Sequence, residues 1–181
     1  PIDENHPLNP ITNYAVSKLI NENFCKLLSQ YDMNFTVLRI SSVFGIGQKE
    51  NFVIPRLINS CILGNELVVH QYKNGFQVMD LVHIDDVCSS IELACGSTRK
   101  FGVYNISSGK PITSLHIAKY LKDLSNINSI KIKKIKKNTN HFIYDISKAK
   151  MELKFKPKIQ VSKKILKPWI DNFKNRLRNN K

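Results

Sequence analysis

The amino-acid sequence predicts an α/β fold, and three observations support this. Segments whose apolar residues recur at the 3.6-residue period of a helix alternate with short apolar, β-branched runs that are typical of buried strands. No low-complexity linker or internal repeat separates these segments. The chain has 181 residues, of which 42% are hydrophobic, and this is enough to bury the core of one full domain.

The first helix is predicted over about 12–31, because Thr12 or Asn13 can cap its first turn. One apolar face of this helix is expected to contact the core, and it consists of Val16, Leu19, Ile20, Phe24, Leu27 and Tyr31. Tyr14 and Lys18 lie four residues apart on a different, narrow face. We therefore expect this pair to face outward, toward solvent, a cleft or a partner.

The later elements are predicted from the same two patterns, the 3.6-residue period of helices and the apolar, β-branched runs of strands, with turn residues between them. Residues 41–51 are polar and carry two glycines, so they are expected to form a loop that leaves the carboxyl end of the first strand. Gly64 ends the second helix, and Asp85 and Asp86 favour the start of the third, because acidic side chains stabilise a helix N-terminus. The strands are expected at 35–40, 66–70, 77–83, 102–107 and 130–135, and the remaining helices at 52–64, 84–95, 113–125, 145–155 and 161–178.

The formal net charge is +14, and most of the excess lies in residues 110–181. A basic surface attracts nucleic acid, anionic membranes or phosphorylated small molecules. The excess is mainly lysine in a chain that is also rich in asparagine and isoleucine, so an AT-rich gene explains much of it, and we expect no nucleic-acid partner. The alternation of lysine and isoleucine at 130–137 is typical of a half-buried edge strand whose lysines prevent further pairing.

No run approaches the ~18 consecutive apolar residues that a membrane span requires. No charged-then-apolar leader opens the chain either. We therefore expect neither a membrane span nor a secretory signal, and a cytoplasmic location.

The cysteines form no CxxC pair and have no regular spacing with the histidines. Buried, reduced thiols are expected, with disulfides or zinc as the alternatives, at Cys25, Cys61, Cys88 and Cys95. His83, Asp85 and Asp86 lie together but coincide with a predicted helix start. That position explains them, and no metal site is expected.

Five segments, taken in order, resemble those of one enzyme family. "PIDENHPLNPITNYAVSK" is similar to the segment around the YxxxK motif of extended short-chain dehydrogenases, and "LRISSVFGIGQ" to the loop LRxxNVYGPGQ. "FQVMDLVHIDDV" resembles xQxRDFVYVDDV, "GVYNISSGKPITSLHIAKYL" resembles xxYNIGSGxxxSxxEL, and "DISKAKMELKFKP" resembles DxSKAxxxLGFxP. YxxxK alone often occurs by chance, so the order and spacing of all five support the assignment. The chain is identified as a member of the NAD-dependent epimerase/dehydratase family, similar to UDP-glucose 4-epimerase.

The resemblance implies a catalytic pair and a cofactor. In this family the tyrosine removes a proton from a sugar hydroxyl while hydride passes to NAD. Tyr14 is accordingly expected to be the acid/base, and Lys18 its electrostatic partner and a ligand of the cofactor ribose. A tyrosine phenol ordinarily has a pKa of ~10, and neighbouring positive charges favour the phenolate. The cofactor is expected to be NAD, with NADP not excluded, and to be bound by Tyr14, Lys18, Ile40 and Ser41.

The resemblance also implies a nucleotide-sugar site, which departs from the family pattern. Met79 stands where nucleotide-sugar epimerases place an arginine suited to a diphosphate; a packed strand residue is the favoured interpretation of Met79, and a substrate ligand is the alternative. Another cation must then offset the phosphate charge, and two lysines after the last predicted strand are the candidates. The expected substrate-binding residues are Ser42, Phe52, Val53, Met79, Lys136 and Lys137.

The GxxGxxG turn that receives the cofactor pyrophosphate is not found in this sequence. The chain is therefore expected to be the C-terminal portion of the enzyme, holding part of a Rossmann-type doubly wound sheet and a small α/β substrate-binding domain. Residues 1–50 are assigned to the NAD(P)-binding domain and 51–181 mostly to the substrate-binding domain, with 77–95 returning to the former. This chain alone is expected to be inactive and to bind no measurable NAD.

The leading interpretation is a nucleotide-sugar epimerase or dehydratase that serves polysaccharide biosynthesis and forms a homodimer when full length. One alternative is a reductase of the same family that acts on a non-nucleotide carbonyl substrate, which the methionine at position 79 favours slightly. The other is a non-catalytic remnant. An in-frame GxxGxxG upstream would support an enzyme, and a stop codon there would support a remnant.

Overall fold

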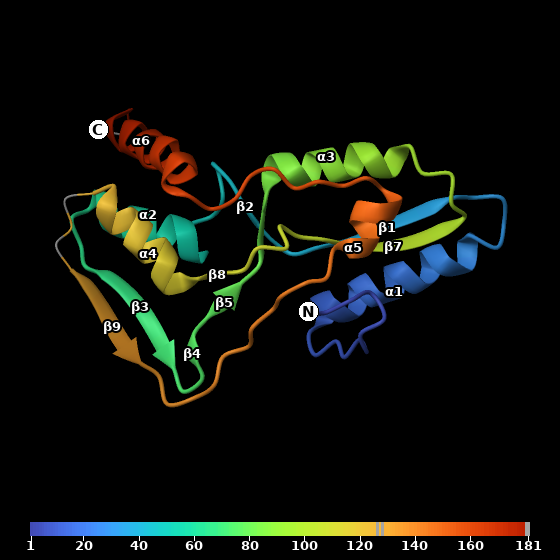
Figure 1. The fold of residues 1–181 in the computed structure, drawn as a ribbon, viewed down its shortest axis with the longest axis horizontal. Helices are drawn as coiled ribbons and strands as arrows, with labels where there is room; N and C mark the ends of the chain where they lie inside the picture. Colours follow the sequence, from blue (N-terminus) through green and yellow to red (C-terminus); the bar gives the residue numbers. More distant parts are fainter. Residues whose placement is uncertain (126, 128, 180–181) are drawn as a thin grey trace.

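The structure, a computed structural model, describes residues 1–125, 127 and 129–179. The secondary-structure elements gather at two ends of an elongated molecule (Figure 1). The end that we call the α1 end holds α1 (Asn13–Leu28), β1 (Phe35–Ile40), α3 (Ile84–Cys95), β7 (Phe101–Ile106) and α5 (Ser147–Glu152). The opposite α6 end holds α2 (Val53–Ile62), β3 (Leu67–Tyr72), β4 (Gly75–Phe76), α4 (Ser114–Asp123), β9 (Ile130–Lys134) and α6 (Lys163–Asn179).

The strands form short parallel and antiparallel pairs at both ends of the molecule and between them. At the α1 end, β1 and β7 run parallel, with Phe35 opposite Phe101 and Ile40 opposite Ile106. In the middle, β2 (Ser42–Phe44) runs parallel to β6 (Leu81–His83), and β5 (Val78–Met79) runs antiparallel to β8 (Ile112–Thr113). At the α6 end the strand order is β4-β3-β9, so β9 is an edge strand within the described residues. Its exposed lysines confirm the edge strand predicted for 130–137, but the expected half-burial is wrong for Ile132, which is 47% exposed.

The described side chains form two buried hydrophobic clusters. The larger one joins α2, α4 and α6 to β3 and includes Ile58, Leu121, Leu166 and Trp169, each at most 1% exposed. The smaller one lies between β7, α3 and α5 and includes Tyr104, Ile106 and Phe155. Because α2, α4 and α6 are amphipathic, each buries one apolar face in the larger cluster, as their 3.6-residue period predicts.

The predicted elements differ from the observed ones at several places, one of which is β4, a strand that was not predicted. The loop predicted at 41–51 contains β2, because these residues pair with β6. The strand predicted at 77–83 is interrupted at Asp80, which separates β5 from β6. β8 was not predicted, and the helix predicted at 145–155 is the shorter α5.

The expectation that the apolar face of α1 contacts the core is wrong for this chain. The side of α1 that faces β1 carries Leu19 from the predicted stripe together with Ala15 and Glu22, and no residue of α1 is fully buried. The rest of the predicted stripe lies on the opposite side and is 40–65% exposed for Val16, Ile20, Phe24, Leu27 and Tyr31. The periodicity therefore predicted an amphipathic helix correctly, but most of its apolar face is exposed and does not contact the core.

The four cysteines are free thiols. The expectation of burial is wrong for Cys88 and Cys95, which are exposed on α3, whereas Cys25 and Cys61 are half-buried. Burial raises the pKa of the Cys61 thiol above its ordinary value. Among the described residues, no helix combines the length and the apolar character needed to cross a membrane.

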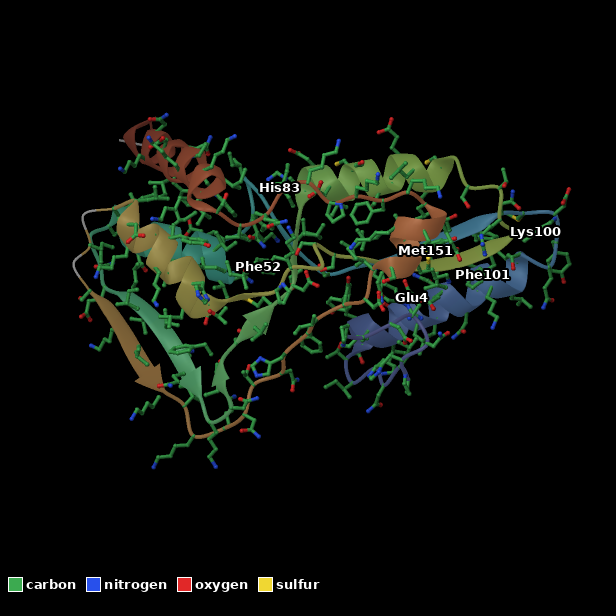
Figure 2. All side chains as sticks on the ribbon, in the orientation of Figure 1. Glu4, Phe52, His83, Lys100, Phe101 and Met151 are labelled. Atoms are coloured by element: carbon green, nitrogen blue, oxygen red, sulfur yellow. The ribbon has the colours of Figure 1, made fainter. Side chains whose placement is uncertain are left out.

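Truncating Leu166 on α6 tests the larger cluster. Leu166 is fully buried, so Leu166→Ala should lower the free energy of unfolding by about 2–5 kcal/mol, the usual cost of a cavity at such a site. Urea denaturation followed by circular dichroism measures this. Met151→Ala is the control, because Met151 is 65% exposed on α5 (Figure 2), and it should change the midpoint little. Equal midpoints for both variants would contradict the assigned core.

Candidate functional site

Two cavities lie in the middle of the molecule and share a wall. The one that we call the α1 cavity, about 700 Å³, lies between α1 and the carboxyl half of β1. The second, the β5 cavity, about 300 Å³, lies between the loop after β2, the start of α2 and β5. Phe142 and Tyr144 line both cavities, so the segment 142–144 forms the wall between them.

Tyr14 and Lys18 line the α1 cavity from the first turns of α1. Thr12 caps this helix, since its hydroxyl oxygen accepts a hydrogen bond from the backbone N–H of Ala15 at 3.1 Å. The Lys18 Nζ lies 5.4 Å from the centroid of the Tyr14 ring, within cation–π range. The α1 cavity therefore presents a phenol and an ammonium group side by side, with Ile40 at the end of β1 on its wall.

The sequence model of the NAD dependent epimerase/dehydratase family matches residues 1–107. The chain belongs to this family. It is 28% identical to the dTDP-glucose 4,6-dehydratase of Actinoplanes sp. over 160 residues, which is 86% of this chain and 49% of that protein. The chain spans about half the length of the curated relatives it matches.

Solved structures agree with the family assignment. The UDP-glucose 4-epimerase of Thermotoga maritima, solved with UDP-glucose, superposes with a TM-score of 0.83 at 26% identity, over 98% of this chain and 58% of that one. The dTDP-glucose 4,6-dehydratase of Bacillus anthracis, solved in complex with NAD, has a TM-score of 0.79 at 22% identity, over 97% and 56% of the two chains. The α/β fold is therefore that of epimerase/dehydratase structures over more than half of their length.

The residues that the family resemblance singled out divide between the two cavities. Tyr14, Lys18 and Ile40 line the α1 cavity. The β5 cavity is lined by Ser42, Phe52, Val53 and Met79; Phe52 lies just before α2 in Figure 2. Ser41 is buried, and its hydroxyl oxygen accepts a hydrogen bond from the hydroxyl of Ser107 at 2.8 Å.

Lys136 and Lys137 are not among the residues that line either cavity. They follow β9, where the carbonyl of Lys137 accepts a hydrogen bond from the backbone N–H of Lys73 at 3.0 Å. A smaller hollow of about 120 Å³ adjoins the β5 cavity, since Val53 and Gln77 line both. Arg56 lines this hollow, and it is a cation that the sequence analysis did not single out.

The segment 142–144 is the part of the site that the sequence analysis missed. Phe142 pairs with Met79 through an isolated parallel bridge, which places an aromatic residue next to the position of the family arginine. One signal of this segment was present in the sequence: Phe142 and Tyr144 are two aromatic residues, separated by one position, in a stretch that was assigned to no helix or strand. Burial, followed by the negative charge of Asp80, raises the pKa of the Tyr144 phenol, so that Tyr144 is a neutral hydroxyl at neutral pH.

Asp80 holds the shared wall in place. Its side chain is almost completely buried, at 2% exposure, between β5 and β6. One carboxylate oxygen accepts the Ser108 hydroxyl at 2.7 Å and the backbone N–H of Gly109 at 3.1 Å. The other accepts the backbone N–H of Tyr144 at 3.3 Å. The charge is thus stabilised by donors from two segments that are distant in sequence.

His83 and Asp85 serve the start of α3, as predicted, whereas the Asp86 side chain in the first turn binds a distant segment of the chain. The His83 Nδ1 accepts the backbone N–H of Asp85 at 3.2 Å. The buried Asp86 carboxylate accepts the backbone N–H groups of Lys158 and Ile159, each at 2.9 Å. In the part of the chain that the structure describes, no group of three or more His, Cys, Asp or Glu residues is arranged to hold a metal ion.

Replacing Asp80 by asparagine tests the wall. The side-chain amide of the variant offers one acceptor oxygen where the carboxylate offers two, so one side of the network faces an N–H donor instead. Asp80→Asn should lower the free energy of unfolding by about 1–3 kcal/mol, measured by urea denaturation. Asp32→Asn is the control, because Asp32 is fully exposed and pairs only at the surface with Lys100. A midpoint for Asp80→Asn equal to that of the control would show that the network contributes nothing.

Proposed function

We propose that this chain is the C-terminal portion of an NAD-dependent nucleotide-sugar epimerase or dehydratase. The observation that supports this most directly is the placement of Tyr14 and Lys18 on the wall of the α1 cavity, which shares Phe142 and Tyr144 with the β5 cavity. A sugar that reaches past this wall from the β5 cavity into the α1 cavity would lie beside the tyrosine, where a cofactor bound in the α1 cavity can contact it. The α1 end is then the last part of the NAD-binding domain, and the α6 end the substrate-binding domain.

The proposed chemistry is proton removal coupled to hydride transfer. NAD, when bound, accepts the hydride from the sugar carbon. Tyr14 takes the proton of the hydroxyl on that same carbon. The C–H electron pair leaves with the hydride, and the C–O bond becomes a carbonyl. Lys18 supplies a positive charge beside the ring and donors suited to ribose hydroxyls. Ile40 and Ser41 complete the cofactor side at the carboxyl end of β1, where ligands bind in open α/β sheets.

The proposed substrate side is the β5 cavity. Ser42, Phe52 and Val53 provide a polar group and two apolar surfaces. Met79 supplies no charge, so a diphosphate bound there needs a cation from elsewhere. Arg56 in the adjoining hollow is placed for this role, and Lys136 and Lys137 remain candidates from the sequence.

Replacing Tyr14 by phenylalanine in the intact enzyme tests the acid/base role. Removing the hydroxyl should lower kcat by about 10²-fold or more, because no other group is proposed to take the proton. Steady-state turnover of nucleotide sugars measures this, with cofactor affinity determined in parallel and expected to persist. Tyr31→Phe is the matched control, because Tyr31 is an exposed tyrosine close to the end of α1. Unchanged turnover in Tyr14→Phe would refute the assignment.

The exposed stripe of α1 supports a homodimer of the intact enzyme. Monomers rarely expose a row of apolar side chains along one helix face, and such faces are typical of subunit contacts. We expect light scattering to report a dimer at micromolar concentration. Phe24→Glu, in the middle of the stripe, should shift it toward monomer, whereas Met151→Glu, at an equally exposed apolar position on α5, should not. A wild-type monomer under these conditions would contradict the proposal.

A further inference from the structure

The position of α1 is not fixed by burial of its side chains. None of its residues is fully buried, and the α1 cavity of about 700 Å³ separates much of it from β1. Ala15 and Leu19 are the apolar residues of α1 that line this cavity, and Cys25 and Leu28 further along the helix are also only half-buried. Since close apolar packing is what normally determines where a helix sits, another interaction has to hold α1.

That interaction is an ion pair between Glu22 on α1 and Arg39 near the end of β1. The Arg39 Nε donates to one carboxylate oxygen of Glu22 at 3.0 Å, and a terminal nitrogen donates to the other at 2.5 Å. The two side chains are only 22% and 17% exposed, so water screens the pair less than it screens a surface pair. The bidentate geometry fixes both the distance and the orientation of the two groups.

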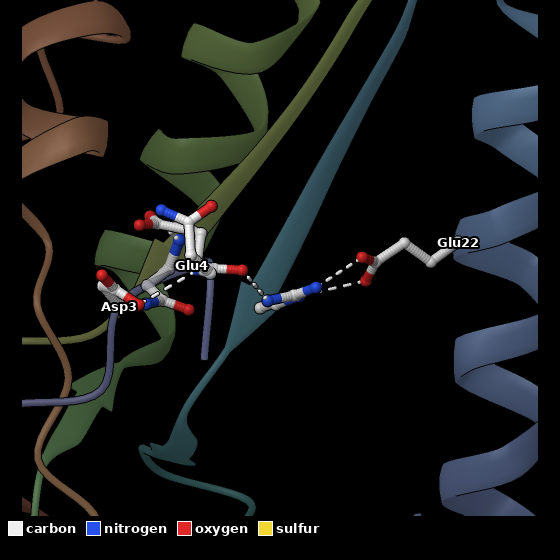
Figure 3. A network of polar contacts seen from close by, with 6 residues as sticks. Asp3, Glu4 and Glu22 are labelled. Atoms are coloured by element: carbon white, nitrogen blue, oxygen red, sulfur yellow. Dashed lines mark hydrogen bonds and ion pairs between the residues drawn. The ribbon is translucent and has the colours of Figure 1, made fainter. Parts of the chain in front are cut away.

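Arg39 is itself held from a third direction. Its other terminal nitrogen donates to the backbone carbonyl of Glu4 at 2.8 Å (Figure 3). The Glu4 carboxylate accepts the backbone N–H of Asn105 on β7 at 2.8 Å. The guanidinium is therefore anchored to the β1–β7 pair independently of its contact with α1, and it acts as a fixed point for the helix.

We propose that the Glu22–Arg39 pair is a positioning device that holds α1 so that Tyr14 and Lys18 face the α1 cavity. Glu22 follows Lys18 by one helical turn and Tyr14 by two, or roughly 6 Å and 12 Å along the axis. A rotation or shift of α1 at Glu22 therefore moves both side chains. The effect of the pair on catalysis rests on the proposed function of Tyr14 and Lys18. The effect of the pair on the position of α1 is independent of that proposed function.

The placement is tested first on this chain, without any activity measurement. Glu22→Gln keeps the shape of the side chain but removes its charge. Hydrogen exchange followed by mass spectrometry should show amide exchange in α1 accelerated by about tenfold or more, with β1 and β7 unchanged. Asp123→Asn, which breaks the exposed pair with Lys163 at the α6 end, is the control and should leave α1 unchanged. Unaltered exchange in α1, or equal acceleration in α1, β1 and β7, would overturn the proposal.

The catalytic consequence is tested in the intact enzyme. Glu22→Gln should lower kcat by about tenfold or more while the KM for the nucleotide sugar changes by less than about threefold, because the substrate wall is untouched. The charge-reversed double variant Glu22→Arg with Arg39→Glu should recover part of the lost kcat. A rise in KM with unchanged kcat, or no recovery of kcat in the double variant, would overturn the positioning role.

A third variant separates this proposal from the acid/base assignment. In a Tyr14→Phe background, Glu22→Gln should lower kcat at saturating NAD much less than it does in the wild type, since the phenol that it positions for proton removal is already absent and only Lys18 can still be displaced. Additive losses would overturn the proposal. If Tyr14→Phe alone leaves turnover unchanged, the acid/base assignment fails, whereas the exchange experiment still decides whether the pair positions α1.

Discussion

A buried carboxylate at Asp80 organises the middle of this molecule. A charge that is 2% exposed is tolerated only when donors surround it, and here the donors come from Ser108, Gly109 and Tyr144. The strand predicted at 77–83 is interrupted at this residue, between β5 and β6. The hydrogen bond from Tyr144 to Asp80 and the bridge from Phe142 to Met79 hold the segment 142–144 against β5, where it forms the wall between the two cavities. The shape of both cavities therefore depends on how one carboxylate is satisfied.

Much of the fold follows from local sequence pattern, because most elements bury an apolar face within this chain. The alternating helices and strands, the edge position of β9 and the caps of α1 and α3 agree with the predictions from periodicity and capping. The apolar face of α1 was misjudged for a physical reason. Periodicity shows which face is apolar but not what covers it, and the side that faces β1 carries a charged residue, Glu22, paired with Arg39.

The candidate site could be predicted only where its functional residues lie close together in the sequence. Tyr14 and Lys18 lie one turn apart, so a helix alone brings them together. Phe142 and Tyr144 reach the same cavities from more than a hundred residues away, through backbone contacts to Met79 and Asp80 that no local pattern encodes. For the same reason, the sequence favoured the two lysines after β9 as partners of a diphosphate and gave no sign of Arg56, which lines the hollow that adjoins the β5 cavity.

The polar contacts also connect the α1 end of the molecule to the wall between the two cavities. Asn105 on β7 donates its backbone N–H to the Glu4 carboxylate and its side-chain amide to the carbonyls of Ile2 and Asp145. The first residues, which carry the contact to Arg39, are thereby tied to the chain that leaves the shared wall at Tyr144. The ion pair that holds α1 and the carboxylate that holds the wall are thus linked through one set of hydrogen bonds and the short backbone segments between them. Because such bonds depend on direction, they fix the relative placement of Tyr14 and Tyr144 in a region where apolar packing is sparse.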